Sequence, residues 1–298
     1  MRIATNTVSE SVLAQIQKLS AQQAKLQSQV STGQKISQPE DDPSAVGRIL
    51  TLDAEARQVQ QFKVNANRAL EVSQATYSGL QDMKKISDRV GEIATLGAGA
   101  SSPDAYKAYA TEVNQLIEQA LQNGNAKLRN DYLFSGTALS TAPLAATRNA
   151  AGDITSVTYA GNTAQTNVQI SELSKIAPGS DSPTNTGMGS FLNNLIALRD
   201  ALNTGVSANV SAAQPNLDNS ENLLVNALSE QGAVQLRIEV AQSQQSTRST
   251  NIEKLISNEA DTDMATSAVK LSQTSTAYEA ALSSSTKILQ MSLLDYLK

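Results

Sequence analysis

The chain has 298 residues, enough for two or three domains or for one extended helical assembly. Aromatic residues make up only 3%, without tryptophan, so the apolar fraction of 40% rests on Ala, Leu, Ile and Val. These residues favour helix-on-helix contact over a thick globular core. The sequence contains neither cysteine nor histidine, which removes disulfides, zinc sites of the usual type and histidine-based acid–base catalysis.

The formal net charge is −5, and the longest basic run is Lys84-Lys85. Because no basic stripe can neutralise phosphates, we expect no nucleic-acid binding. No stretch approaches the roughly 20 apolar residues that span a bilayer, so we expect no membrane insertion. The opening residues Met1–Asn6 have no apolar h-region, so a cleaved signal peptide is not expected and an exported chain would use another route.

Near the N-terminus, apolar residues recur in steps of 4, 3, 7 and 4. The stripe consists of Val12, Ile16, Leu19, Leu26 and Val30. This heptad spacing predicts an amphipathic helix over roughly residues 7–32 that pairs with another helix, and Gly33 ends it. An ordinary surface helix lying on a core is the alternative.

A second, very long helix is predicted over about residues 43–96. Asp42 followed by Pro43 is a helix start, because the carboxylate accepts free N–H groups and proline tolerates the first turn. The neighbouring acids Glu40 and Asp41 are better explained by capping and solvation than by a metal site. Ser102-Pro103 predicts the start of a further helix, with Ser102 as the cap; Asn123-Gly124-Asn125 weakens its pattern, and Gly136 ends it.

Residues 137–186 change character, with Gly, Pro, Thr, Asn and Ser dominating and an apolar period of 2. Ile154, Val157 and Tyr159 predict one strand, and Val168 and Ile170 predict a second. Gly161-Asn162 is expected to lie in a turn, and the pattern indicates a small β-rich insert.

Helical signals return from Phe191 to Leu202, and a second long helix is predicted to begin near Leu217. Its polar segment 241–251 is expected to be solvated or to form a polar contact between subunits. Asp261–Asp263 predicts the cap of a last helix with steps that alternate between 4 and 3. That stripe consists of Met264, Ala268, Leu271, Ser275, Tyr278, Leu282, Ser285, Leu289, Ser292 and Tyr296. Leu293 extends the apolar surface around the helix, which requires cover on several sides, so neighbouring copies are expected to supply it.

These elements predict a mainly α fold, a long antiparallel helical rod with paired N- and C-terminal coiled-coil helices and the small β-rich insert at its tip. The expected divisions are a coiled-coil half over 1–36, half of the rod over 37–136, the insert over 137–186, the other rod half over 187–260 and a second coiled-coil half over 261–298. The residues expected to make assembly contacts are Val12, Ile16, Leu19, Leu26, Val30, Met264, Leu271, Tyr278, Leu282, Leu289, Leu293 and Tyr296.

The sequence offers little support for two other classes of function, an enzyme and an adhesin. Gly187-Met188-Gly189 lacks the rest of a phosphate-loop fingerprint, and Glu259, Asp261 and Asp263 are followed by no Ca²⁺-loop pattern. We therefore assign no catalytic, cofactor-binding or metal-binding residue, expect no cofactor, and interpret the chain as a non-enzyme. A peptide-binding coiled-coil adhesin stays open as an alternative.

The order of elements resembles the flagellin family over about residues 1–136 and 188–298. Met1-Arg2-Ile3 and Ser31–Ile36 are similar to the N-terminal signature of that family. Pro39–Ala45 matches its Pro-x-Asp-Asp-Pro-x-Ala turn, and Glu259–Ala265 is similar to its second turn. Glu40 departs from the family pattern, where serine is common, at a solvated position where a polar swap matters little.

Within the family, Tyr132–Gly136 and the ending Ser292–Leu297 resemble the branch whose members join the hook to the filament, and a filament-forming flagellin is the alternative. The resemblance implies a structural subunit of the bacterial flagellum, extracellular and exported unfolded through the flagellar type III apparatus. The implied partners are copies of itself, the hook-side junction protein, flagellin and a type III export chaperone.

Overall fold

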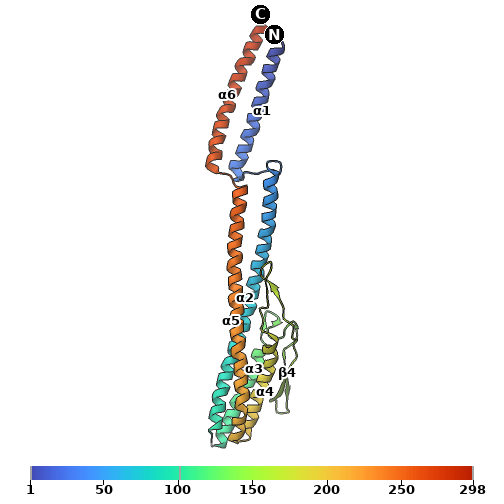
Figure 1. Ribbon diagram of the computed structural model, residues 1–298, viewed down its shortest axis with the longest axis vertical. Coiled ribbons are helices and arrows are strands. Elements are labelled where there is room, and N and C mark those ends of the chain that lie inside the picture. The colour runs from blue at the N-terminus through green and yellow to red at the C-terminus, as the bar shows by residue number, and fades with distance from the viewer. Residues whose placement is uncertain (1, 101, 297–298) are drawn as a thin grey trace. The chain divides into compact units, whose positions relative to one another are not determined.

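The computed structural model describes residues 2–100 and 102–296, with side chains described over residues 10–100 and 102–287. It confirms a mainly α fold with a small β-rich insert (Figure 1). The described elements, in chain order, are α1 (Arg2–Thr32), α2 (Pro43–Ala98), α3 (Pro103–Gly124), β1 (Lys127–Leu128), β2 (Asp131–Tyr132), β3 (Leu144–Arg148), β4 (Ile154–Tyr159), β5 (Val168–Gln169), β6 (Lys175–Ile176), α4 (Ser182–Asn203), α5 (Ser207–Ala260) and α6 (Met264–Tyr296).

The chain divides into two compact units. The terminal unit comprises residues 1–58 and 248–298, and the central unit comprises residues 59–247. Helices α2 and α5 therefore contribute to both units. The five-part division expected from the sequence stays a prediction.

The central unit is built around α3 and α4, which pack side by side and carry the β3–β4 hairpin against them (Figure 1). Its core contains fully buried side chains from α3, from the segment before β3, from β4 and from α4, including Ile117, Phe134, Ile154 and Leu195. The β-rich insert thus lies along α3 and α4, whereas the sequence placed it at the tip of a rod. Burial of one apolar face of the hairpin against the helices explains this position.

The two strands predicted from the sequence lie in separate hairpins. β4 pairs antiparallel with β3, and β5 pairs antiparallel with β6. The two predicted strands therefore do not pair with each other. Each predicted strand exists, but its partner, Leu144–Arg148 for one and Lys175–Ile176 for the other, is a segment that the sequence pattern did not identify as a strand.

Two helix bounds also differ from the expectation. α3 ends at Gly124 rather than Gly136, because the side chain of Asn125 forms two hydrogen bonds with the backbone of Leu144, at 2.9 and 3.0 Å. α5 begins at Ser207 rather than near Leu217 and contains Pro215. The fully buried side chain of Val210 fixes this added stretch to the core, which offsets the backbone hydrogen bond that the proline removes.

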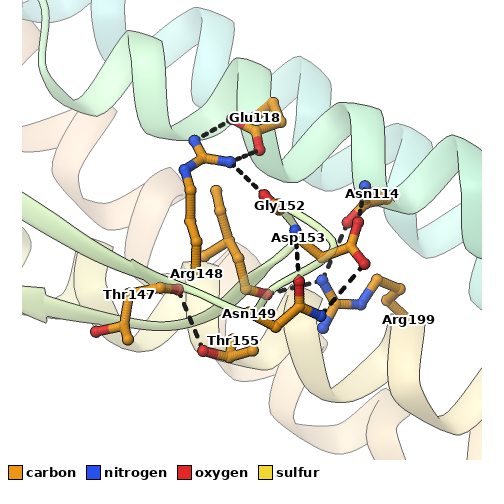
Figure 2. A network of polar contacts seen from close by, with 10 residues as sticks. Asn114, Glu118, Thr147, Arg148, Asn149, Gly152, Asp153, Thr155 and Arg199 are labelled. Atoms are coloured by element: carbon orange, nitrogen blue, oxygen red, sulfur yellow. Dashed lines mark hydrogen bonds and ion pairs between the residues drawn. The ribbon is translucent and has the colours of Figure 1, made fainter.

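A polar network joins α3, α4 and the β3–β4 hairpin (Figure 2). Arg199, only 7% exposed, donates to Asn114 Oδ1 at 3.0 Å and to the carbonyl of Ile154 at 2.7 Å. Arg148 on β3 forms a two-nitrogen ion pair with Glu118 on α3. Because a buried guanidinium needs its donors satisfied, these contacts fix the hairpin on the helices.

The β5–β6 hairpin is held by a second apolar cluster in the central unit. Ile170 and Ile176 are 2% and 3% exposed and pack with Ala66, Ala69, Ile238 and Ala241. Gln245, within the polar segment 241–251, is 5% exposed, and its amide donates to the carbonyl of Ile170 at 3.3 Å. The insert therefore covers the polar segment at Gln245, and the Gln245 side chain makes a contact within the chain.

Candidate assembly surface

The predicted stripe on α1 forms one side of that helix. Val12, Ile16, Leu19 and Val30 are half-buried, and Leu26 is 8% exposed. α6 packs antiparallel beside α1 within the terminal unit (Figure 1), so this stripe is the side turned towards α6. The heptad spacing therefore identified the pairing side of α1 correctly; its role in assembly stays a prediction.

The pairing side of α6 differs in part from the predicted stripe. The half-buried and buried side chains in its described part are Ser267, Leu271, Thr274, Ser275, Tyr278, Ala281 and Ser285. Leu271, Ser275, Tyr278 and Ser285 are in both sets, but Met264 and Leu282 are 46% and 41% exposed. Steps of 4 and 3 fit either set, and the small side chains of the first set allow the bulkier stripe of α1 to approach closely.

The large apolar side chains of Met264 and Leu282 consequently lie on the flank of α6, beside the side that faces α1. Met264 and Leu282 are 18 residues apart, five turns of helix, and so lie on the same face. Leu289, Leu293 and Tyr296 belong to the same predicted set, and their side chains lie outside the described residues.

The α1–α6 pair buries little apolar surface. Among the described side chains of α1 and α6, those below a tenth exposed are Leu26, Ser267 and Thr274. Two of these three are polar, so over its described side chains the pair has no continuous buried apolar layer of the kind that stabilises an isolated coiled coil. Further apolar contact is needed to hold these helices firmly, and neighbouring copies can supply it.

The turns that connect the terminal helices to α2 and α5 are hydrogen-bonded to each other. Lys35 N donates to the carbonyl of Ala260 at 2.6 Å, and Thr262 N donates to the carbonyl of Gly33 at 2.9 Å. Two ion pairs within the same unit, Arg48–Glu259 at 2.8 Å and Arg248–Glu55 at 2.6 Å, join α2 to α5. The two turn signatures of the sequence thus meet in space.

The acidic residues in these turns serve as caps, as the sequence predicted. Asp42 Oδ1 accepts from Ala45 N at 2.9 Å at the start of α2, and Asp263 Oδ1 accepts from Ala265 N at 3.0 Å at the start of α6. The hydrogen bonds from Thr266 lower the pKa of Asp263. At the predicted cap of α3, Ser102 occupies the position but forms no side-chain cap hydrogen bond.

Asp41 organises the first turn. Its carboxylate accepts from Lys25 Nζ at 2.7 Å, from Ser37 N at 3.1 Å and from Gln38 N at 3.2 Å. The Lys25 hydrogen bond, followed by the two backbone hydrogen bonds, lowers the pKa of Asp41 below its ordinary value of 3.8. Because the pKa is lower in the folded state, the ionised carboxylate stabilises the turn. This stabilisation is complete above the ordinary pKa of 3.8 and is lost as the pH falls through the lower folded-state pKa.

We therefore expect the Asp41 carboxyl to titrate below its ordinary value in the folded chain, and Lys25→Ala to raise that midpoint by removing the largest cause of the shift. Carbon-detected NMR of the side-chain carboxyl measures both. Lys18→Ala, an exposed lysine on the same helix, is the matched control and should leave the midpoint unchanged. An Asp41 midpoint that Lys25→Ala does not move would contradict the assignment.

Among the described residues, no group of three or more acidic side chains lies close enough to hold a metal ion. Within the same residues, no helix combines the length and the apolar content needed to cross a membrane.

Comparison with known proteins gives a family match and a relative. Residues 3–138 match the family model described as the bacterial flagellin N-terminal helical region. Flagellar hook-associated protein 3 of Salmonella typhimurium is 29% identical over 171 residues, which are 56% of this chain and 54% of the relative. The match thus spans about half the length of that curated relative.

Solved structures share the fold. The proposed flagellar hook-associated protein of Vibrio parahaemolyticus has a TM-score of 0.65 at 19% identity, covering 74% of this chain and 100% of its own. The FlgL protein of Bacillus cereus has a TM-score of 0.60 at 14% identity, covering 70% of this chain and 99% of its own. At these identities the likeness concerns the fold.

Proposed function

We propose that the chain is a structural subunit of the flagellum that joins the hook to the filament, because residues 3–138 match the bacterial flagellin N-terminal helical region. The observation that carries the proposal is the α1–α6 pair. Its inner side is only half-buried, while Leu13, Met264, Val269 and Leu282 are exposed. Such helices are suited to pack against further copies.

The junction role is favoured over a filament-forming flagellin by two features. The curated relative is named as a hook-associated protein. The segment Tyr132–Gly136 resembles the same branch, and the structure gives it a physical role: Phe134 is fully buried and Tyr159 Oη donates to the Phe134 carbonyl at 3.1 Å. The segment thus fixes the start of the insert to the helical core.

The proposed partners are copies of the same chain and the other axial proteins on either side of the junction, the hook-side junction protein and flagellin. We place the chain outside the cell, exported by the flagellar type III route without signal cleavage and with an export chaperone before secretion. The curated relative is named as a flagellar hook-associated protein, and we propose no catalytic role for this chain.

Immunogold labelling tests the position of the chain in the flagellum. An epitope inserted between Ala150 and Ala151, both exposed in the β3–β4 turn, avoids the antibody cross-reactivity that related terminal helices would cause. We expect gold confined to the boundary of hook and filament. Gold along the filament would assign the chain as a flagellin, and unlabelled flagella with the protein retained in cells would contradict both roles. Cells with the untagged chain are the control.

A further inference from the structure

A cavity of about 530 Å³ lies in the central unit, among α2, the β1–β2 hairpin and residues 165–180. Its apolar lining comes from Ala69, Val72, Leu128, Leu133, Leu139 and Val168. We call it the side cavity. Its volume is within the range of about 300–1,000 Å³ that is usual for binding pockets.

The charged groups that line the side cavity are not all paired. Glu71 and Arg129 form an ion pair of 2.6 Å, so their charges compensate each other. Arg68 and Asp131 also line the cavity and form no ion pair within the described residues. An occupant that complements this cavity has an apolar group flanked by one acidic and one basic side chain.

The turn between β5 and β6 presents such a group. Leu173 is 98% exposed, the most exposed of the large apolar side chains among the described residues. Glu172 precedes it and Lys175 follows two residues later, and both side chains are exposed without an ion pair in the described part of the chain. We call residues 171–175 the tip loop.

The tip loop is rigidly held. Ile170 N and Ser171 N donate to the carbonyl of Ser174 at 3.1 and 3.3 Å. Asn65 on α2 donates to the carbonyl of Gln169 at 2.9 Å, and the side chain of Gln169 donates to the carbonyl of Glu172 at 3.1 Å. Leu173 is therefore presented to solvent by a preorganised turn, so little conformational entropy is lost when it is bound.

The tip loop does not reach the cavity of its own chain, because Glu172 and Leu173 are absent from the cavity lining and Leu173 is almost wholly exposed. A contact between the two features therefore joins different copies. Two different patches that meet make a heterologous contact, and such contacts generate rings or helical arrays.

We propose that the tip loop of one copy inserts Leu173 into the side cavity of the next, with Glu172 facing Arg68 and Lys175 facing Asp131. The contact uses a surface separate from the α1–α6 pair. It requires that copies meet, and it does not depend on which axial position they occupy.

Disulfide trapping tests the contact. Because the chain has no cysteine, native residues form no disulfides that would obscure the result. Full-length chains with Leu173→Cys are mixed with chains carrying Leu139→Cys in the cavity and oxidised at high concentration. We expect the mixed dimer to form roughly tenfold above the yield with Leu236→Cys, an exposed leucine on α5 outside the cavity. A yield equal to this control would overturn the proposal.

A charge swap then tests the orientation. Arg68→Glu in the cavity chain should lower the trapped yield roughly tenfold, and Glu172→Lys in the tip chain should restore it, because the two charges are exchanged. Failure to restore the yield overturns the assigned pairing. If no trapping occurs but a small molecule protects Leu139→Cys from a thiol reagent, the cavity is a ligand site and the proposal is wrong.

The same trapping in flagella isolated from cells that produce both cysteine variants separates this proposal from the proposed function. A mixed dimer in solution together with flagella that lack the chain contradicts the flagellar role and supports the contact. Flagella that contain both variants without a mixed dimer above the control overturn the contact and support the flagellar role.

Discussion

Leu282→Asp should abolish incorporation of the chain into flagella while the isolated monomer keeps its melting temperature. Leu282 is 41% exposed beside the α1–α6 seam, in line with Met264 on the same face of α6. If a neighbouring copy covers this face, the substitution places an unpaired charge in an apolar contact, in addition to the cost of about 2–5 kcal/mol that removal of a buried leucine side chain has. If the binding free energy between neighbouring copies falls by more than about 3 kcal/mol per contact, incorporation drops more than 100-fold.

In the monomer, the same substitution occurs at a position that is already partly solvated. Exposed positions of this kind change the free energy of unfolding by about 0.5 kcal/mol or less. Ser284→Asp, an exposed residue on the same helix, is the matched control and should incorporate normally. Immunoblots of purified flagella and of culture medium separate failed assembly from failed export, and calorimetry measures the monomer.

Two outcomes would contradict this account. A monomer that melts several degrees lower would mean that Leu282 packs within the chain. Normal incorporation of Leu282→Asp would mean that the exposed flank of α6 faces solvent in the assembly. Leu26→Asp behaves differently in either case, because Leu26 is 8% exposed inside the seam and its loss separates α1 from α6.

The sequence predicted the helices well because their ends are fixed by local chemistry. The long helix expected over 43–96 is Pro43–Ala98, and its cap at Asp42 is formed as expected. The end of α1 at Thr32, followed by Gly33 with a φ of 72°, follows from the ability of glycine to adopt the left-handed conformation. None of these features needs a contact with a distant residue.

The misplaced elements depend on distant contacts instead. The true end of α3 relies on Asn125 bonding to Leu144, and the early start of α5 relies on burial of Val210. β3 has the sequence Leu-Ala-Ala-Thr-Arg, which is a poor strand by propensity and exists because it pairs with β4. Local pattern cannot report such contacts, since tertiary packing overrides propensity.

The candidate assembly surface was predicted in part for a similar reason. On α1 the large apolar residues are the pairing side, so hydrophobic spacing identified them. On α6 the pairing side uses Ser267 and Thr274, which hydrophobic spacing ignores, and leaves Leu282 beside it. The run of small residues at steps of 3 and 4 was the signal that could have found it.

Phe134→Ala should be among the most destabilising single substitutions in the central unit. The Phe134 side chain is fully buried in the core, and its ring lies against Gly79 of α2, where an added methyl group would come within 2.9 Å of Cζ. Truncation removes this contact and leaves a cavity between α2 and the segment that precedes β3. The expected loss is about 3–5 kcal/mol in the free energy of unfolding, and a fall in melting temperature of roughly 10 °C for a unit of this size.

Denaturant unfolding of the full chain, followed by circular dichroism, measures the effect. Phe134→Leu retains most of the buried side-chain volume, so its free energy of unfolding should fall clearly less than that of Phe134→Ala. Leu173→Ala, at a side chain that is 98% exposed, is the control and should change the stability by about 0.5 kcal/mol or less. A loss below about 1 kcal/mol for Phe134→Ala would mean that the site collapses around the smaller side chain. The Tyr132–Gly136 segment would then not depend on its aromatic ring to fix the insert to α2.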